Sequence, residues 1–156
     1  MAQDEDGLRQ FAKRCDAEVK RKRADQRAIH ERLGARMQAG VQGKISGMMK
    51  NARGGRDKVA GWQKTYIGSG GGYAAVRPVS PPTGKGSPGA ITNAIVSGHA
   101  IRRPSGRSKR RYTPHIHVLH VDGIDFYDAM RSELPDMLQD EVERWGDEMA
   151  ARLEGR

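Results

Sequence analysis

Apolar residues near the end of the chain repeat at the spacing of an α-helix. Successive apolar positions are separated by steps of three or four residues: Phe126, Met130, Leu134, Leu138, Val142, Trp145, Met149 and Leu153. This stripe predicts a C-terminal helix over 125–154, with Asp125 as its N-cap. Pro135 lacks a backbone donor and crowds the preceding turn, so we expect a kink or a restart near Glu133. The stripe can pack on the sheet of its own chain or on a neighbouring copy. Packing within its own chain is the default expectation for an apolar helix face.

A second helical pattern lies in the N-terminal part. Apolar residues recur at helical spacing from Leu8 to Met37, which predicts a long helix within an N-terminal helical region over 8–50. The basic stretch KRKRADQR (20–27) has no apolar anchor, so it should face solvent or an acidic surface. We expect the helix to fray or bend at four glycines, because each weakens a helix by about 1 kcal/mol relative to alanine. They are Gly34, Gly40, Gly43 and Gly47.

The middle of the chain carries the patterns of strands and turns. Trp62–Ile67 and Tyr73–Val79 are rich in β-branched and aromatic residues and flank GSGGG, which predicts a β-hairpin. The stretch SPPTGKGSPG (80–89) is too rich in proline and glycine for a helix or strand, so we expect a long exposed loop. A short helix over 88–97 should follow, capped by Ser87 and ended by Gly98.

Two further strands are expected after this short helix. His99–Arg103 and Tyr112–Val121 flank an arginine-rich turn with the Pro-Ser-Gly signal, so they should form a second hairpin. The prediction is an α+β fold with a long N-terminal helix, an antiparallel β-sheet over 62–121 with one short inserted helix, and a long C-terminal helix packed on the sheet. A chain of 156 residues suits one domain, over 1–156.

The net charge of +9 is divided unevenly along the chain. Residues 1–121 hold 24 Lys and Arg against 8 Asp and Glu, whereas residues 122–156 hold 4 against 11. An acidic C-terminal helix beside a basic body can pair within one copy or with the next copy, and leaves basic surface for phosphate or an acidic partner. The same charges can also serve solubility alone.

Candidate chemistry is sparse. His115 and His117 would share one face of a strand, as zinc ligands can, but His120 falls on the other face, and histidines at a subunit contact explain the same residues. Cys15 lies on a helical apolar face as a small core residue. No phosphate-binding loop, dinucleotide fingerprint or Gly-x-Ser-x-Gly elbow is present. We expect no enzymatic activity and no cofactor or metal.

Membrane insertion is not expected either. No apolar run in the sequence approaches the roughly 20 residues that cross a bilayer. The acidic start MAQDEDG differs from the basic first region of a signal peptide, so we expect the chain to stay in the cytoplasm of the cell that makes it.

Two strings of the second half carry a resemblance. ITNAIVSGHAIRRPSGR (91–107), followed by a predicted strand and then VDGIDFYDAM (121–130), is similar to the tail-completion or neck proteins of long-tailed bacteriophages, also described as minor tail or head-tail joining proteins. In that family a short helix ending in Gly-His precedes a hairpin, and a Val-x-Gly-x-x-Phe-Tyr string opens the last long helix. The resemblance is most specific at Gly98-His99 and at Val121 to Tyr127.

The resemblance implies a structural virion protein. Such a protein forms a ring, suggested to have six copies, at the head-tail junction, completes the tail and joins it to the capsid connector. Its partners would be other copies of itself, neck and tail proteins such as the tail terminator, tail tube and head connector, and genomic DNA in the lumen. It would be assembled in the host cytoplasm and located in the virion.

The charge division suggests which residues make these contacts. Acidic residues of the last helix would meet basic surface on the adjacent copy, namely Asp140, Glu141 and Asp147. Basic residues of the second hairpin would face the genome or an acidic ring, namely Arg102, Arg103, Arg107, Lys109, Arg110 and Arg111. Contacts of this kind weaken with salt. The alternative function is a small basic nucleic-acid-binding protein without a fixed ring.

Overall fold

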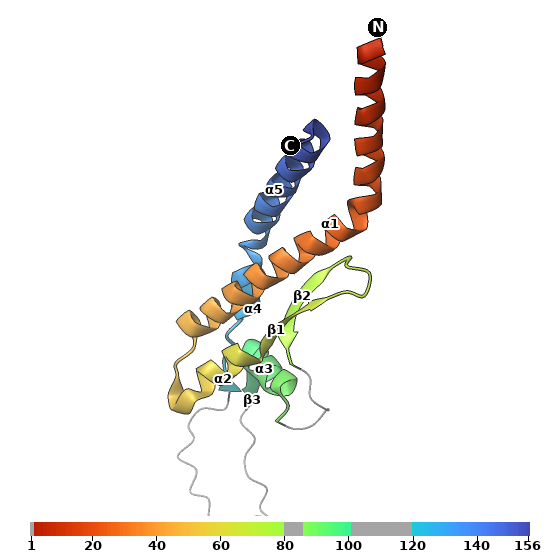
Figure 1. The fold of residues 1–156 in the computed structure, drawn as a ribbon. Helices are drawn as coiled ribbons and strands as arrows, with labels where there is room; N and C mark the ends of the chain where they lie inside the picture. The colour runs from red at the N-terminus through yellow and green to blue at the C-terminus, as the bar shows by residue number, and fades with distance from the viewer. Residues whose placement is uncertain (1, 80–85, 101–119) are drawn as a thin grey trace, which may run out of the picture.

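The computed structural model describes residues 2–79, 86–100 and 120–156 (Figure 1). Long helices begin and end the chain, and two small antiparallel sheets and short helices lie between them. The predicted α+β class is therefore confirmed. In order, the elements are α1 (Ala2–Met48), the 3-10 turn η1 (Ala52–Gly54), α2 (Gly55–Trp62), β1 (Gln63–Ile67), β2 (Ala74–Pro78), α3 (Pro88–Ser97), β3 (His99–Ala100), β4 (His120–Val121), α4 (Phe126–Arg131) and α5 (Leu134–Glu154).

Helix α1 is the element against which most of the others pack. It contacts α2, β1, β2, α4 and α5, while its N-terminal turns run away from the rest of the chain (Figure 1). The expected break at the glycines is wrong, because α1 is helical without interruption from Ala2 to Met48. The bend that Figure 1 shows lies nearer the N-terminus, where the ribbon is still reddish orange.

Two of the four α1 glycines at which a break was expected are places where other elements come close. A Cβ added at Gly34 would lie 2.4 Å from Cγ2 of Thr65 on β1, and one added at Gly40 would lie 2.3 Å from the sulfur of Met130 on α4. Gly43 and Gly47 have nothing within 4 Å of such an atom. The cost of glycine to the helix is therefore offset by close packing at Gly34 and Gly40.

The hydrophobic core lies where the C-terminal half of α1 meets α2 and α4. Its buried members are Val41 and Ile45 from α1, Val59 from α2, and Phe126 and Met130 from α4. Partly buried residues from β2, α3 and α5 surround this cluster. The apolar stripe of the C-terminal segment thus contributes its first two members to the main core.

A buried amide links the sheet to α4. Gln63 is fully buried, and its Nε2 donates to the Val59 carbonyl at 3.1 Å while its Oε1 accepts from the Tyr127 hydroxyl at 2.5 Å. Burial raises the pKa of Tyr127 to about 12. Because both polar ends of Gln63 are satisfied, the residue can occupy the interior without a large desolvation penalty.

The predicted first hairpin is confirmed. Strands β1 and β2 pair antiparallel from Gln63 opposite Pro78 to Ile67 opposite Ala74. Thr65 attaches β1 to α1, because its hydroxyl donates to the Gly34 carbonyl at 2.7 Å. The second sheet, β3 with β4, is separate from the first, so residues 2–79, 86–100 and 120–156 form two two-stranded sheets instead of the predicted single sheet.

The short inserted helix is confirmed with its cap. Helix α3 spans Pro88–Ser97, and the Ser87 side chain accepts from the Ala90 amide at 3.2 Å. Gly98 ends it with a φ of 72° and a ψ of 175°, a glycine conformation other than the expected left-handed helical one. Of the predicted loop over 80–89, residues 80–85 lie outside the described residues, as do 101–119 of the second hairpin.

Gly98 and Gly123 allow the end of α3 to lie directly against the segment that precedes α4. A Cβ at Gly98 would lie 2.4 Å from the Val121 carbonyl oxygen, and one at Gly123 would lie 2.2 Å from the Val96 carbonyl oxygen. The Ile124 amide donates to the Ile95 carbonyl at 2.8 Å. Only glycine allows two backbones to come this close, so α3, the β3–β4 pair and α4 form one packed junction.

The C-terminal helical segment restarts as predicted at Pro135. Helix α4 ends at Arg131, and α5 begins at Leu134 with Pro135 in its first turn. The Asp125 side chain caps α4 by accepting from the Asp128 amide at 2.9 Å. Helix α5 packs along α1, whereas the sequence predicted packing on the sheet. The difference arises because polar and charged contacts join α5 to α1 along its length.

Two alanine substitutions separate the roles of glycine in α1. We expect Gly43→Ala to raise the free energy of unfolding by about 0.5–1 kcal/mol, because alanine is the better helix former and nothing obstructs its Cβ. We expect Gly34→Ala to lower it by about 1–3 kcal/mol, because β1 must move away from α1. Urea denaturation followed by circular dichroism measures both values, and equal stabilisation by both changes would contradict the close-packing role of Gly34.

Candidate interaction surface

Helices α1 and α5 are joined midway by arginine–carboxylate contacts. Arg32 Nε lies 2.7 Å from Glu141 Oε2, and Arg36 lies 2.7 Å from Asp140 Oδ2 and 3.5 Å from Glu141 Oε1. Glu141 is only 2% exposed, and its carboxylate accepts from both arginines. The hydrogen bond to Asp140 is the main cause of a raised pKa of Arg36. Charge-assisted hydrogen bonds of this geometry fix the rotation of α5 about its axis.

A second group of polar contacts joins the helices nearer their free ends. Arg152 donates to both carboxylate oxygens of Glu18, at 2.8 and 2.9 Å, and to Asp25 at 2.8 Å. Asp25 also accepts from the Trp145 indole nitrogen at 3.2 Å. The hydrogen bond from Arg152 is the main reason that the pKa of Glu18 is lowered, and the same bond raises the pKa of Arg152. These contacts set the two helices antiparallel.

The structure gives the three predicted acidic residues different surroundings. Glu141 and Asp140 bind arginines of their own chain, and a carboxylate as buried as that of Glu141 is not offered to another copy. Asp140 keeps an exposed side chain beside Arg36. Asp147 is exposed, and its role in contact with an adjacent copy stays a prediction.

The arginines on α1 that bind α5 were not identified from the sequence. Arg32 and Arg36 are four residues apart, a spacing that places two side chains on the same face of a helix. A basic pair at this spacing, together with acidic neighbours on a second amphipathic helix, is the signal that could have indicated the contact. The direction of α5 relative to α1, which decides the pairing, is not encoded in that spacing.

The predicted basic residues and two of the predicted histidines lie outside the described residues. These are Arg102, Arg103, Arg107, Lys109, Arg110 and Arg111, together with His115 and His117. His120 is described and is exposed on β4. Within residues 2–79, 86–100 and 120–156, no group of three or more His, Cys, Asp or Glu side chains is placed to hold a metal ion.

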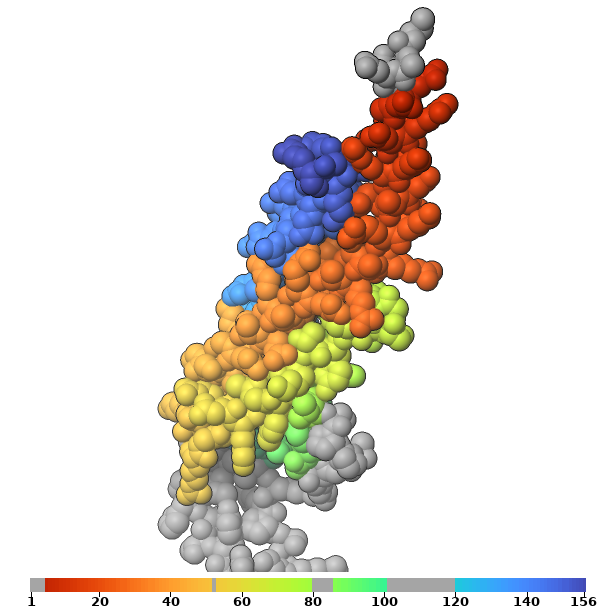
Figure 2. Space-filling view, viewed as in Figure 1, coloured from red at the N-terminus to blue at the C-terminus, as the bar shows by residue number. Residues whose placement is uncertain are grey.

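Large apolar side chains are exposed along both long helices. On the N-terminal turns of α1, Leu8, Phe11 and Val19 are 69%, 50% and 74% exposed. On α5, Leu138 and Val142 are 49% and 48% exposed. In Figure 2 the first turns of α1, drawn in red, extend beyond the end of α5, drawn in blue. The predicted apolar stripes therefore lie on helices, as expected. Other described parts of the chain cover these stripes only in part.

An apolar groove runs between α1 and α5. It consists of two adjoining hollows of about 420 and 310 Å³ that share His30 as a lining residue. The apolar residues that line it are Ile29, Leu33 and Met37 of α1, Leu134, Leu138, Val142 and Trp145 of α5, and Tyr73 and Ala74 at the hairpin. A groove that is long, open and mainly apolar suits a helix or an extended segment better than a small polar ligand.

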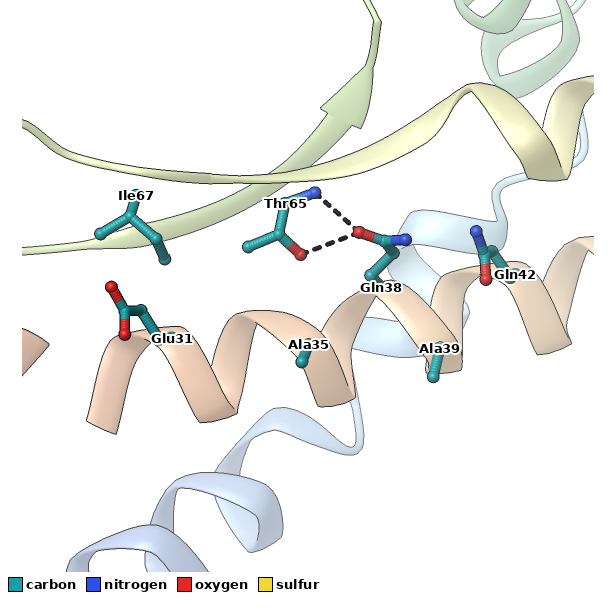
Figure 3. Close-up of a pocket in the computed structure, with 7 residues that line it drawn as sticks. All are labelled: Glu31, Ala35, Gln38, Ala39, Gln42, Thr65 and Ile67. Atoms are coloured by element: carbon teal, nitrogen blue, oxygen red, sulfur yellow. Dashed lines mark hydrogen bonds between the residues drawn. The ribbon is translucent and has the colours of Figure 1, made fainter. Parts of the chain in front are cut away.

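A third hollow lies between α1 and β1 (Figure 3). It has a volume of about 420 Å³, and its polar lining includes Gln38, whose Oε1 accepts from the Thr65 amide at 2.9 Å and from the Thr65 hydroxyl at 3.1 Å. Glu31 is the ionisable side chain of this lining, and it pairs with Arg27 at 2.8 Å. The lining therefore supplies hydrogen-bonding groups that are already engaged, without a pair of groups arranged for acid–base catalysis.

In comparisons with known proteins, no protein-family model, no curated protein and no solved structure matches this chain. Among the described helices, none combines the length and apolar character needed to span a bilayer.

Neutralising Glu141 tests the midway contact between the helices. We expect Glu141→Gln to lower the free energy of unfolding by about 1–3 kcal/mol, because two arginines lose a buried anionic acceptor. Asp147→Asn is the matched control on the same helix and should change stability by less than about 0.5 kcal/mol. Chemical denaturation measures both, and equal effects would show that the Glu141 contact does not stabilise the fold.

The Glu18–Arg152 pair predicts a dependence of stability on pH. Because the folded-state pKa of Glu18 lies below its ordinary value of 4.5, the stabilisation is present above that value and is lost as pH falls through the lowered folded value. We expect the stability difference between the wild type and Glu18→Gln to shrink on acidification from about pH 6 to pH 3. Denaturation across this range measures it. Glu5→Gln, at an exposed position, serves as the control, and a constant difference for Glu18→Gln would contradict the assignment.

Proposed function

We propose that this chain is a structural, non-enzymatic virion protein of a tailed bacteriophage. It assembles as a ring at the head-tail junction, completes the tail and joins it to the capsid connector. The resemblance to phage neck proteins suggests six copies in the ring. Its neighbours are the tail tube or tail terminator on one side and the head connector on the other. The work is done by contacts among proteins and with the genome in the lumen, and it needs no cofactor.

The observation that carries this proposal is the junction of the two strings on which the resemblance depends. Gly98-His99 and Val121 to Tyr127 are separated by more than twenty residues, yet they lie against each other. Gly98 and Gly123 provide the close backbone approach, and His99 pairs with Val121 between β3 and β4. The two strings therefore serve one structural purpose, which supports treating them as parts of one motif.

The surface of the described chain supports assembly with other copies or proteins. Exposed apolar residues at helical spacing, such as Leu8 and Phe11, gain stability when a partner covers them. Exposed acidic residues of α5, including Asp147, provide a complementary surface for a basic neighbour. The basic residues over 102–111 remain the proposed contacts with the genome or with an acidic ring.

A small basic nucleic-acid-binding protein is the second candidate. The observation that favours it is the excess of basic residues before Asp122, 24 against 8 acidic ones. Each lysine or arginine that neutralises a phosphate releases counterions, so such a protein would bind duplex DNA with a steep salt dependence.

Size-exclusion chromatography with light scattering, combined with a DNA titration at two salt concentrations, tests the proposed function. We expect an oligomer whose mass is a multiple of the 17.2 kDa chain and whose DNA binding is weak at physiological salt. A monomer at every concentration that binds duplex DNA with a steep salt slope would overturn the ring and favour the second candidate.

A further inference from the structure

The N-terminal part of α1 is a helix with an uncovered apolar face. We call residues 8–23 the arm. Its apolar residues Leu8, Phe11, Cys15 and Val19 follow at steps of three, four and four, so they form one stripe. Three of them are half exposed or more, and Cys15 is partly exposed. A stripe of this kind on a preformed helix resembles the face that an amphipathic helix lays into a groove.

The groove between α1 and α5 has the matching character. Its rim carries exposed apolar residues one helical turn apart, Leu138 and Val142, and a third, Tyr73, at the hairpin. Its floor is lined by Ile29 and Leu33 of α1. The four-residue step from Leu138 to Val142 matches the steps from Phe11 to Cys15 and from Cys15 to Val19, which suits packing of the i±4 rows of two helices.

The charges of the arm and of α5 are equal and opposite. The arm holds seven Lys and Arg against two Asp and Glu, a balance of +5, while α5 (134–154) holds two against seven, a balance of −5. Arg14 and Glu18 of the arm already bind α5 of the same chain. Basic residues of the arm that remain exposed are Arg9, Lys13, Lys20, Arg21, Lys22 and Arg23, and exposed acidic residues of α5 are Asp136, Asp140, Glu143, Asp147, Glu148 and Glu154.

The apolar stripe of the arm cannot reach the Leu33–Leu138 part of the groove in its own chain, although Lys22, near the end of the arm, lines the other part. Helix α1 is continuous, and Leu33, which lines the groove beside Leu138, is eighteen residues beyond Cys15. At 1.5 Å per residue this separates the two positions by about 27 Å along the helix. The arm and groove of one molecule are therefore complementary surfaces that only two different molecules can bring together.

We infer that the arm of one copy docks along the α1–α5 groove of a second copy. The apolar stripe of the arm covers Leu138 and Val142, and the opposite net charges of the arm and α5 favour the approach of the two helices. The inference deepens the proposed function and rests on it for the ring, because an arm passed from each copy to the next closes a head-to-tail assembly.

A thiol crosslink tests the docking. Leu138→Cys places a thiol on the rim, and Cys15 supplies the thiol on the arm of the next copy, so a short bifunctional thiol reagent should join different chains. We expect a ladder of covalent oligomers in denaturing electrophoresis, ending at the mass that light scattering gives for the native assembly. Adding Cys15→Ser should abolish the ladder. Glu143→Cys, about 140° around α5 from Leu138, should give little crosslinking.

The outcomes distinguish the docking from the ring. A covalent dimer without higher members would support the docking but overturn the ring, because two arms exchanged reciprocally close a two-fold pair. An assembly that light scattering detects but that Leu138→Cys does not crosslink would overturn the docking and leave the ring. A monomer at all concentrations would overturn both.

Two arm variants test the same contact without a reagent. Phe11→Glu buries a charge at the centre of the docked stripe, whereas Gln10→Glu adds the same charge one residue away on an exposed polar position. We expect Phe11→Glu to raise the dissociation constant of the assembly by about tenfold or more, and Gln10→Glu by about twofold or less. Both positions are exposed in the single chain, so circular dichroism should show unchanged folding. Equal effects on assembly would overturn the docking.

Discussion

The structure depends on how closely other elements approach one side of α1. Gly34 lets β1 come close enough for the Thr65 hydroxyl to bond the helix backbone, and Gly40 makes room for Met130 of α4. Beyond these points, Val41 and Ile45 are buried by α2 and α4. A helix that supports a hairpin, a short helix and a second long helix needs small residues where backbones meet and large ones where side chains fill the space. The positions of β1, α2 and α4 against α1 follow from this division.

The charge balance of the two parts of the sequence does not show which charges are exposed on the surface, because some charges of α1 and α5 pair with each other. The sequence shows a basic body and an acidic C-terminal segment, which predicts that the two attract each other. In the structure part of that attraction is satisfied within the chain, by Arg32 and Arg36 with Glu141 and Asp140. Only the acids that remain exposed, such as Asp147, are available for contacts with other molecules.

Local features could be predicted from the sequence, and long-range placement could not. The caps at Ser87 and Asp125, the restart at Pro135 and the first hairpin each depend on a few neighbouring residues, and the structure confirms them. Helix propensity predicts a weak helix at Gly34 and Gly40, but it cannot show that Thr65 and Met130 approach these glycines. For the same reason the apolar stripe predicted that α5 is amphipathic but not that it packs on α1.

The length of α1 has a consequence for how the arm can bind. A short isolated helix is marginal in water because its first turn is costly to form, but the arm continues a helix whose C-terminal half is already packed. Each turn of the arm therefore extends a helix that is already formed. Arg14 and Glu18 attach the middle of the arm to α5. The arm therefore presents Leu8 and Phe11 in a helical arrangement before any partner is present. A partner that covers Leu8 and Phe11 therefore does not have to order the backbone of the arm, and less of the free energy of the apolar contact is lost to ordering.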